Sequence, residues 1–211
     1  MAGGTLINYT QLQARATLLA SLEGWSDVNP SPDWAGLVNQ AYIQFSWDGE
    51  CLITNTTVTT VSNQAAYTLS GQWRRLMDVV YDSGGAKSPV RHSSEDFERY
   101  LRADWRVQPS GTPVRYTFNP FNTLTLVPAP TTAGVLVAVR GVAEAAPLVS
   151  GTDIPTIPDV LHEAIALKAA IFQGKVYAQG EASQRLDRYE AQYQQYVQDA
   201  LRYANVETMG D

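Results

Sequence analysis

The period of the hydrophobic pattern changes twice along this chain, and this restricts the possible folds more than any other feature. Residues 1–50 repeat apolar side chains at the three- and four-residue spacing of helices, and residues 155–205 do so again. Residues 51–154 are instead rich in Thr, Val, Tyr, Pro and Gly, in short runs typical of strands. The pattern predicts an α+β fold: a helical bundle from the N- and C-terminal helices, with an inserted antiparallel β-sheet or sandwich.

Two helices are predicted before residue 50. Thr10 and Gln13 have the spacing of a capping box, which predicts that the first helix begins at Thr10. Ser31 is expected to cap the second helix, with Pro32 in its first turn, where a missing N–H costs nothing. One broad apolar face follows, made by Trp34, Leu37, Val38, Ala41, Tyr42 and Phe45.

The middle segment predicts about five to seven strands. Residues 58–61 and 66–69 flank a turn-prone stretch, so they are expected to form a hairpin. The last three strands are joined by short links, which predicts that they are antiparallel neighbours. The expected strands are 58–61, 66–69, 75–81, 114–118, 123–127 and 134–139.

The C-terminal segment predicts two more helices and a flexible end. The last helix has a heptad-like seam suited to packing in a bundle. Residues 206–211 carry little apolar mass, so they are predicted to be a flexible tail that cannot bury enough surface to offset its ordering entropy. The seam residues are Leu186, Tyr189, Tyr193, Tyr196, Ala200 and Tyr203.

Composition excludes several classes of protein. The formal net charge is −6, which disfavours a nucleic-acid clamp, because phosphate contacts need clustered Lys and Arg. No run of about 18 apolar residues is present, so no membrane span is expected. The first residues lack the pattern of a secretory signal. The single Cys51 excludes an internal disulfide and a multi-cysteine metal site, as suits a protein made in a reducing cytoplasm.

The sequence contains no recognisable set of catalytic, cofactor-binding or metal-binding residues. Residues 84–88 (Gly-Gly-Ala-Lys-Ser) are similar to the end of a phosphate-binding loop, but Ala precedes the Lys and Pro89 follows. His162 and Glu163 begin like a zinc-protease helix, yet the second His is replaced by Ala166. We therefore expect no cofactor, and we expect His162 to lie partly solvated in the first turn of its helix.

An acidic and basic cluster follows residue 94. Glu95, Asp96 and Glu98 could supply the paired carboxylates of a glycoside hydrolase. Mixed charges at helical spacing favour instead a solvated helix face with ion pairs, and Phe97 and Leu101 are expected on its inner side.

A short basic and aromatic cluster is a second candidate site. Trp73, Arg74 and Arg75 could contact DNA in a channel, by stacking and charge, or could contact a neighbouring subunit. The alternative is the start of a strand with exposed arginines. More generally, five Trp and eleven Tyr residues are a density typical of protein–protein contacts, although core packing is the default for each.

Six short motifs occur in a fixed order along residues 8–205. This order resembles that of the bacteriophage head-to-tail adaptor (connector, or head completion) family. The motifs are the second-helix segment Pro32–Ala41, Tyr67-Thr68-Leu69, the strand Arg74–Tyr81, Gly111–Tyr116, the strand Leu124–Pro130 and Ile157–Leu161.

The resemblance implies a structural virion protein rather than an enzyme. Such adaptors form a ring, usually of twelve copies, under the portal protein in the virion neck. The ring extends the channel through which double-stranded DNA passes without sequence-specific binding, and it offers a surface to the tail, nozzle or stopper protein. The resemblance also implies that the chain end reaches toward the portal, so we predict that the tail orders on assembly, with Tyr203, Val206 and Met209 as its anchors. A virion-associated cell-wall hydrolase and a host-surface binding module are the alternatives.

Overall fold

The computed structural model describes residues 7–25, 32–101, 106, 109–177 and 181–209. It is an α+β structure, as predicted, and it divides into two compact units. The first, here called the helical unit, comprises residues 1–52 and 145–211. The second, the β unit, comprises residues 53–144.

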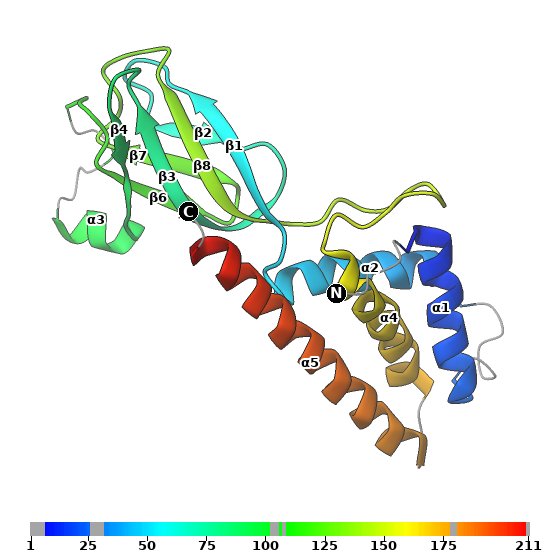
Figure 1. Ribbon diagram of the computed structural model, residues 1–211. Helices are drawn as coiled ribbons and strands as arrows, with labels where there is room; N and C mark the ends of the chain where they lie inside the picture. The colour runs from blue at the N-terminus through cyan, green and yellow to red at the C-terminus, as the bar shows by residue number, and fades with distance from the viewer. Residues whose placement is uncertain (1–6, 26–31, 102–105, 107–108, 178–180, 210–211) are drawn as a thin grey trace. The chain divides into compact units, whose positions relative to one another are not determined.

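Helix α4 is the centre of the helical unit. It packs against α1, α2 and α5, and Figure 1 shows it between α1 and α5. Because neighbours surround it, α4 is buried nearly all round, from Ala164 to Ile171. The elements are α1 (Tyr9–Leu22), α2 (Trp34–Asp48), the 3₁₀ turn η2 (Asp159–Leu161), α4 (His162–Tyr177) and α5 (Glu181–Met209).

The core of the helical unit joins both ends of the sequence. Val38, Tyr42 and Phe45 from α2 pack with Ile165 from α4 and Tyr193 from α5, all at most 1% exposed. The apolar face predicted for the second helix therefore packs on the C-terminal helices. This confirms the predicted bundle.

The helix starts differ from those predicted. Asn8, not Thr10, caps α1: its side chain accepts a hydrogen bond from the N–H of Gln11, and the Gln11 side chain accepts one from the N–H of Asn8. Asp33 caps α2 by accepting from the N–H of Gly36. Ser31, the predicted cap, lies outside the described residues. Asn and Asp are favoured N-cap residues, as Ser and Thr are. The sequence therefore contains several possible N-caps within a few residues of each helix start.

Asn39 of α2 fixes the chain where it returns from the β unit. Its Oδ1 accepts from the N–H of Leu148 at 2.7 Å, and its Nδ2 donates to the Leu148 carbonyl at 3.0 Å. Nδ2 also lies 2.9 Å from the hydroxyl of Tyr9. One amide thus satisfies both backbone groups of the buried Leu148 and joins α1, α2 and the returning segment.

We expect Asn39→Ala to lower the free energy of unfolding by about 1–3 kcal/mol, because both backbone groups of Leu148 lose their partner. Urea unfolding followed by circular dichroism measures this. Gln40→Ala, at the exposed neighbouring position, is the control and should change stability by no more than about 0.5 kcal/mol. Equal effects of the two variants would show that the amide does not hold this segment.

The β unit is a sandwich of two four-stranded sheets, with strand orders β1-β8-β3-β4 and β2-β7-β6-β5. All pairings between these strands are antiparallel except β5 with β6, which is parallel. Figure 1 shows both sheets and the short helix α3. The elements are β1 (Ile53–Thr59), β2 (Ala66–Thr68), β3 (Trp73–Asp82), β4 (Lys87–Pro89), β5 (Arg91–His92), α3 (Glu95–Leu101), β6 (Arg115–Asn119), β7 (Thr123–Val127) and β8 (Leu136–Ala143).

The predicted strands are largely present, but two predicted pairings are wrong. Residues 58–61 and 66–69 do not form a hairpin, because β1 pairs with β8 and β2 pairs with β7. Strand β7 pairs with β6 as expected, whereas β8 crosses to the other sheet and lies between β1 and β3. Short links are equally compatible with a crossing between the two sheets of a sandwich, so link length alone did not decide the partner.

Each sheet turns its apolar residues towards the other. Val79, Val137 and Val139 from one sheet pack with Tyr116 and Leu124 from the other. At one end, the Asn122 side chain also ties the sheets together. Its Oδ1 accepts from the N–H of Trp73 at 2.9 Å, and its Nδ2 donates to the Gly71 carbonyl at 2.9 Å.

Candidate docking surfaces

Helix α5 is held in place by aromatic side chains along its seam. Tyr193 donates a hydrogen bond to Asp48 at 2.9 Å, and its ring packs edge-on against Phe45. One turn earlier, Tyr189 donates to Glu23 at 3.1 Å and packs edge-on against Trp25. Burial and the neighbouring Asp48 carboxylate raise the pKa of Tyr193 far above its usual range, so the phenol stays a donor.

Lys168 lies beneath this seam with only 8% of its surface exposed. Its Nζ is 4.2 Å from the centroid of the Tyr193 ring and 5.3 Å from that of Phe172, a cation–π arrangement. Burial lowers the pKa of Lys168, and the charge of Asp48 opposes that shift. The ammonium group of Lys168 is therefore itself enclosed, beside the rings of Tyr193 and Phe172.

We expect Lys168→Met to leave the free energy of unfolding unchanged or to raise it by up to about 1 kcal/mol at neutral pH, because a buried charge is replaced by an apolar chain of similar length. The lowered pKa means that the unfolded chain binds the proton more readily. The difference in stability between Lys168→Met and the parent should therefore shrink as the pH rises towards about 10.4, the usual pKa of a Lys side chain.

The control is Lys175→Met, which removes a half-exposed ion pair with Glu190 and should change stability by less than about 0.5 kcal/mol. Chemical unfolding at pH 7 and pH 10 measures both variants. A loss of more than about 1 kcal/mol for Lys168→Met would show that the cation–π contact outweighs the cost of burial.

The end of α5 carries the predicted portal anchors. The helix continues to Met209, past the boundary expected near residue 205, because Gly210 is the first helix breaker after Arg202. Tyr203 is 51% exposed, although it was assigned to the packing seam; Val197 is buried instead. Val206 and Met209 belong to α5 by their backbone, and their side chains lie outside the described residues. Spacings of three residues place all three positions along neighbouring sides of one helix.

Helix α3 has the opposite orientation to the one predicted. Glu98 is fully buried, and Arg115 of β6 donates to its two carboxylate oxygens at 2.6 and 3.1 Å. Burial alone raises the pKa of Glu98, but the bonds from Arg115 outweigh this and hold the pKa below its usual value. The expected solvated face is therefore wrong for Glu98.

The apolar stripe of α3 consequently points outward. Phe97, Tyr100 and Leu101 are spaced i, i+3 and i+4, and they are 50%, 86% and 47% exposed. The inner placement predicted for Phe97 and Leu101 is wrong. The stripe itself was visible in the sequence, but its direction is set by the ion pair of Glu98 with Arg115, which lies 17 residues away. An exposed aliphatic and aromatic stripe of this kind is typical of protein–protein contact surfaces.

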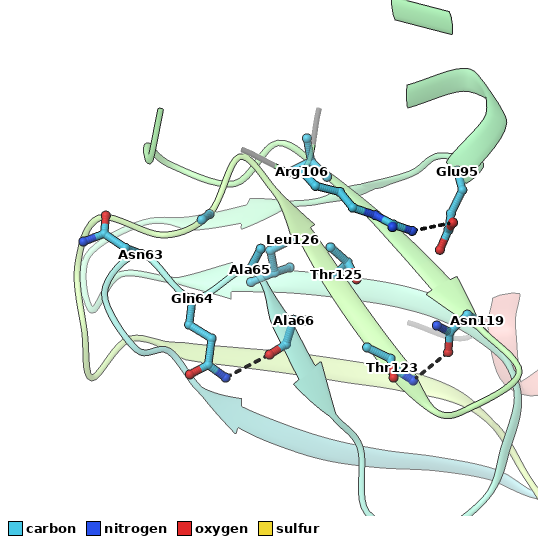
Figure 2. A pocket seen from close by; sticks show the side chains of 12 residues that line it. Asn63, Gln64, Ala65, Ala66, Glu95, Arg106, Asn119, Thr123, Thr125 and Leu126 are labelled. Atoms are coloured by element: carbon cyan, nitrogen blue, oxygen red, sulfur yellow. Dashed lines mark hydrogen bonds and ion pairs between the residues drawn. The ribbon is translucent and has the colours of Figure 1, made fainter. Parts of the chain in front are cut away.

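A hollow lined by Glu95 of α3 does not bring carboxylates together. Figure 2 shows Glu95 and Arg106, 2.9 Å apart, above the strands that form its floor. The hollow has a volume of about 530 Å³, and Glu95 is the only carboxylate among its described lining residues. Glu98 is buried in its own ion pair, and Asp96 is 95% exposed on α3. These three carboxylates therefore do not form the pair that glycoside hydrolysis needs.

The Trp73–Arg75 cluster is divided between core and surface. Trp73 is 7% exposed, and its indole N–H donates to the Ser70 carbonyl at 2.7 Å. It is therefore a core residue and presents no face for stacking. Arg74 and Arg75 are exposed at the start of β3.

The remaining candidates for chemistry are structural. His162 is fully buried, contrary to the prediction: its Nδ1 accepts from the N–H of Ile7 at 3.4 Å, which leaves Nε2 to donate to the Ile157 carbonyl at 3.1 Å. Burial raises the pKa of the Cys51 thiol to about 11, so the thiol is protonated at neutral pH. Residues 84–88 lead into strand β4 rather than a helix.

The described residues contain neither a cluster of metal ligands nor a membrane-spanning helix. Within the described ranges, no three His, Cys, Asp or Glu side chains come together as metal ligands. No helix in the described part of the chain combines the length and hydropathy that a membrane crossing needs.

The fold defines a class of protein: a two-unit α+β protein whose exposed apolar and aromatic side chains suit contacts with other proteins. The model of the SU10 adaptor protein family matches residues 7–209. The chain belongs to this family of phage head-to-tail adaptors, which are structural proteins and not an enzyme family. No curated protein matches the sequence.

Proposed function

We propose that copies of this chain form a ring, of twelve subunits, that docks under the portal protein in the virion neck. The ring extends the channel for the packaged DNA and gives the tail, nozzle or stopper protein its attachment surface. The observation that carries the proposal is the family match over residues 7–209, nearly the whole chain. A match of this extent includes both the bundle and the β unit.

Charge and surface support this role. Each copy carries a formal charge of −6, so the ring is acidic and does not grip a DNA molecule that passes through it. The β unit offers the exposed stripe of α3 and the helical unit offers the exposed Tyr203, and a subunit that contacts both its neighbours and the portal needs such side chains. We assign Tyr203, Val206 and Met209 to the portal, and the exposed Arg74 and Arg75 to contacts with a neighbouring subunit or with the channel.

Mass measurement in solution, with and without purified portal protein, tests the proposal. We expect one complex that contains the portal and twelve copies of this chain. A chain that remains separate from the portal at every concentration would contradict it. In that case, binding to host cells and release of dye from labelled cell walls would test the host-surface and hydrolase alternatives directly.

A further inference from the structure

The edges of the two sheets differ sharply in length. A sheet edge presents unpaired backbone N–H and C=O groups, to which another strand can bind. In the described β unit, three of the four terminal strands are very short: β2 and β4 have three residues each, and β5 has two. The fourth, β1, has seven residues.

Strand β1 also lacks the features that usually protect a long edge. Natural edges carry charged residues, Pro or bulges, which prevent unwanted pairing. The sequence of β1, Ile-Thr-Asn-Thr-Thr-Val-Thr, contains neither a charge nor Pro. Its register with β8 is continuous over seven pairs, from Ile53 with Val142 to Thr59 with Leu136. By contrast, β4 carries Lys87 and Pro89.

We propose that β1 binds an extended strand of a different neck protein, which adds to the sheet beside it. This proposal rests on the proposed adaptor function. Backbone hydrogen bonds along β1 would provide affinity, and side-chain pockets would provide specificity. Because β1 is uncharged and rich in β-branched residues, the matching strand is uncharged and β-branched along the pairing segment.

A hollow beside β1 provides such a pocket. It has a volume of about 230 Å³, and Thr54, Asn55 and Thr56 of β1 are among the residues that line it. Gln72 and Glu144 also line it. Hydroxyl, amide and carboxylate groups line it, so it suits one side chain of the incoming strand that donates hydrogen bonds.

None of the strands that the structure describes would let a second copy of this chain supply the matching strand. The terminal strands β2, β4 and β5 are too short to pair with seven residues. The part of β3 that β4 leaves uncovered, residues 73–79, contains both irregularities of its pairing with β8. Pairing of β1 with β1 of another copy gives a two-fold contact, which closes at two subunits and cannot continue around a ring.

Site-specific photo-crosslinking in assembled virions identifies the occupant. A photo-crosslinking amino acid placed at Thr57, an exposed position near the middle of β1, should give a product with the mass of this chain plus a different neck protein. A product with twice the mass of this chain would overturn the proposal, and so would the absence of any product when virions assemble normally.

Two matched double variants test the role of the edge. We expect Thr57→Lys with Thr59→Lys to fold and to bind the portal normally, but to reduce the yield of complete particles at least tenfold, because charges on an edge strand prevent pairing. The control, Ala138→Lys with Leu136→Lys, places the same charges on β8, directly opposite those positions but away from the edge. Normal yield from the β1 variant, or equal loss from both, would contradict the proposal, whereas failure of every form to bind the portal would contradict the adaptor function instead.

Discussion

A chain that ends at Arg202 is expected to fold but to lose attachment to portal-containing heads, with at least a tenfold fall in occupancy. Among the α5 side chains that the structure describes, the buried ones, including Tyr193, Val197 and Ala200, all precede the cut. The truncated chain should therefore keep its fold and its helical bundle. Its circular dichroism should lose only the helical signal of the last turns of α5. Removal of residues 203–211 deletes all three proposed anchors. Each subunit of the ring makes this weak contact once, so its removal from every subunit lowers the avidity of the whole ring for the portal.

Co-sedimentation of each variant with portal-containing heads measures this effect. A chain that ends at Met209 keeps the anchors and should attach like the full-length protein. Tyr203→Ala alone should give an intermediate loss, because Val206 and Met209 remain. If the chain that ends at Arg202 attaches as well as the parent, the portal contact lies elsewhere, and the outward stripe of α3 becomes the first candidate.

Glu98→Gln is expected to lower the free energy of unfolding of the β unit by about 2–4 kcal/mol at neutral pH, since it removes the charge of a buried ion pair. Glu98 is fully buried, while the Arg115 side chain is 33% exposed. Water can therefore solvate part of the Arg115 charge in the variant, which reduces the destabilisation. The same pair orients α3. The substitution should therefore also disturb the outward stripe of Phe97, Tyr100 and Leu101.

The pH dependence provides a second readout. The pKa of Glu98 is below its usual value in the folded protein, so its ionised form stabilises the fold. That contribution is complete above the unfolded value of about 4.3 and is lost as the pH falls through the folded pKa. The difference between parent and Glu98→Gln should thus shrink at acid pH.

Urea unfolding at pH 7 and pH 3 measures the parent and the variant. Asp96→Asn is the control, because Asp96 is 95% exposed on the same helix and should change stability by no more than about 0.5 kcal/mol. A difference for Glu98→Gln that does not depend on pH would show that packing, and not charge, is responsible for the destabilisation.

Local patterns determined much of this fold. The apolar face from Trp34 to Phe45 predicted α2 because a helix that must bury one side repeats apolar residues at that spacing. The runs at 75–81 and 123–127 predicted β3 and β7 for the corresponding reason in strands. The family resemblance also followed from the order of motifs along the chain, which needs no coordinates.

Tertiary structure alone decided pairing partners and the direction of faces. Strand β8 pairs with β1 and β3, far away in sequence, because burial between two sheets outweighs the short link to β7. Glu98 turns inward, and the α3 stripe outward, because Arg115 supplies a partner that local spacing cannot show. His162 is buried for the same reason: Ile7 and Ile157 provide its hydrogen bonds. A sequence shows which side chains need partners, whereas only the folded chain shows which partners they find.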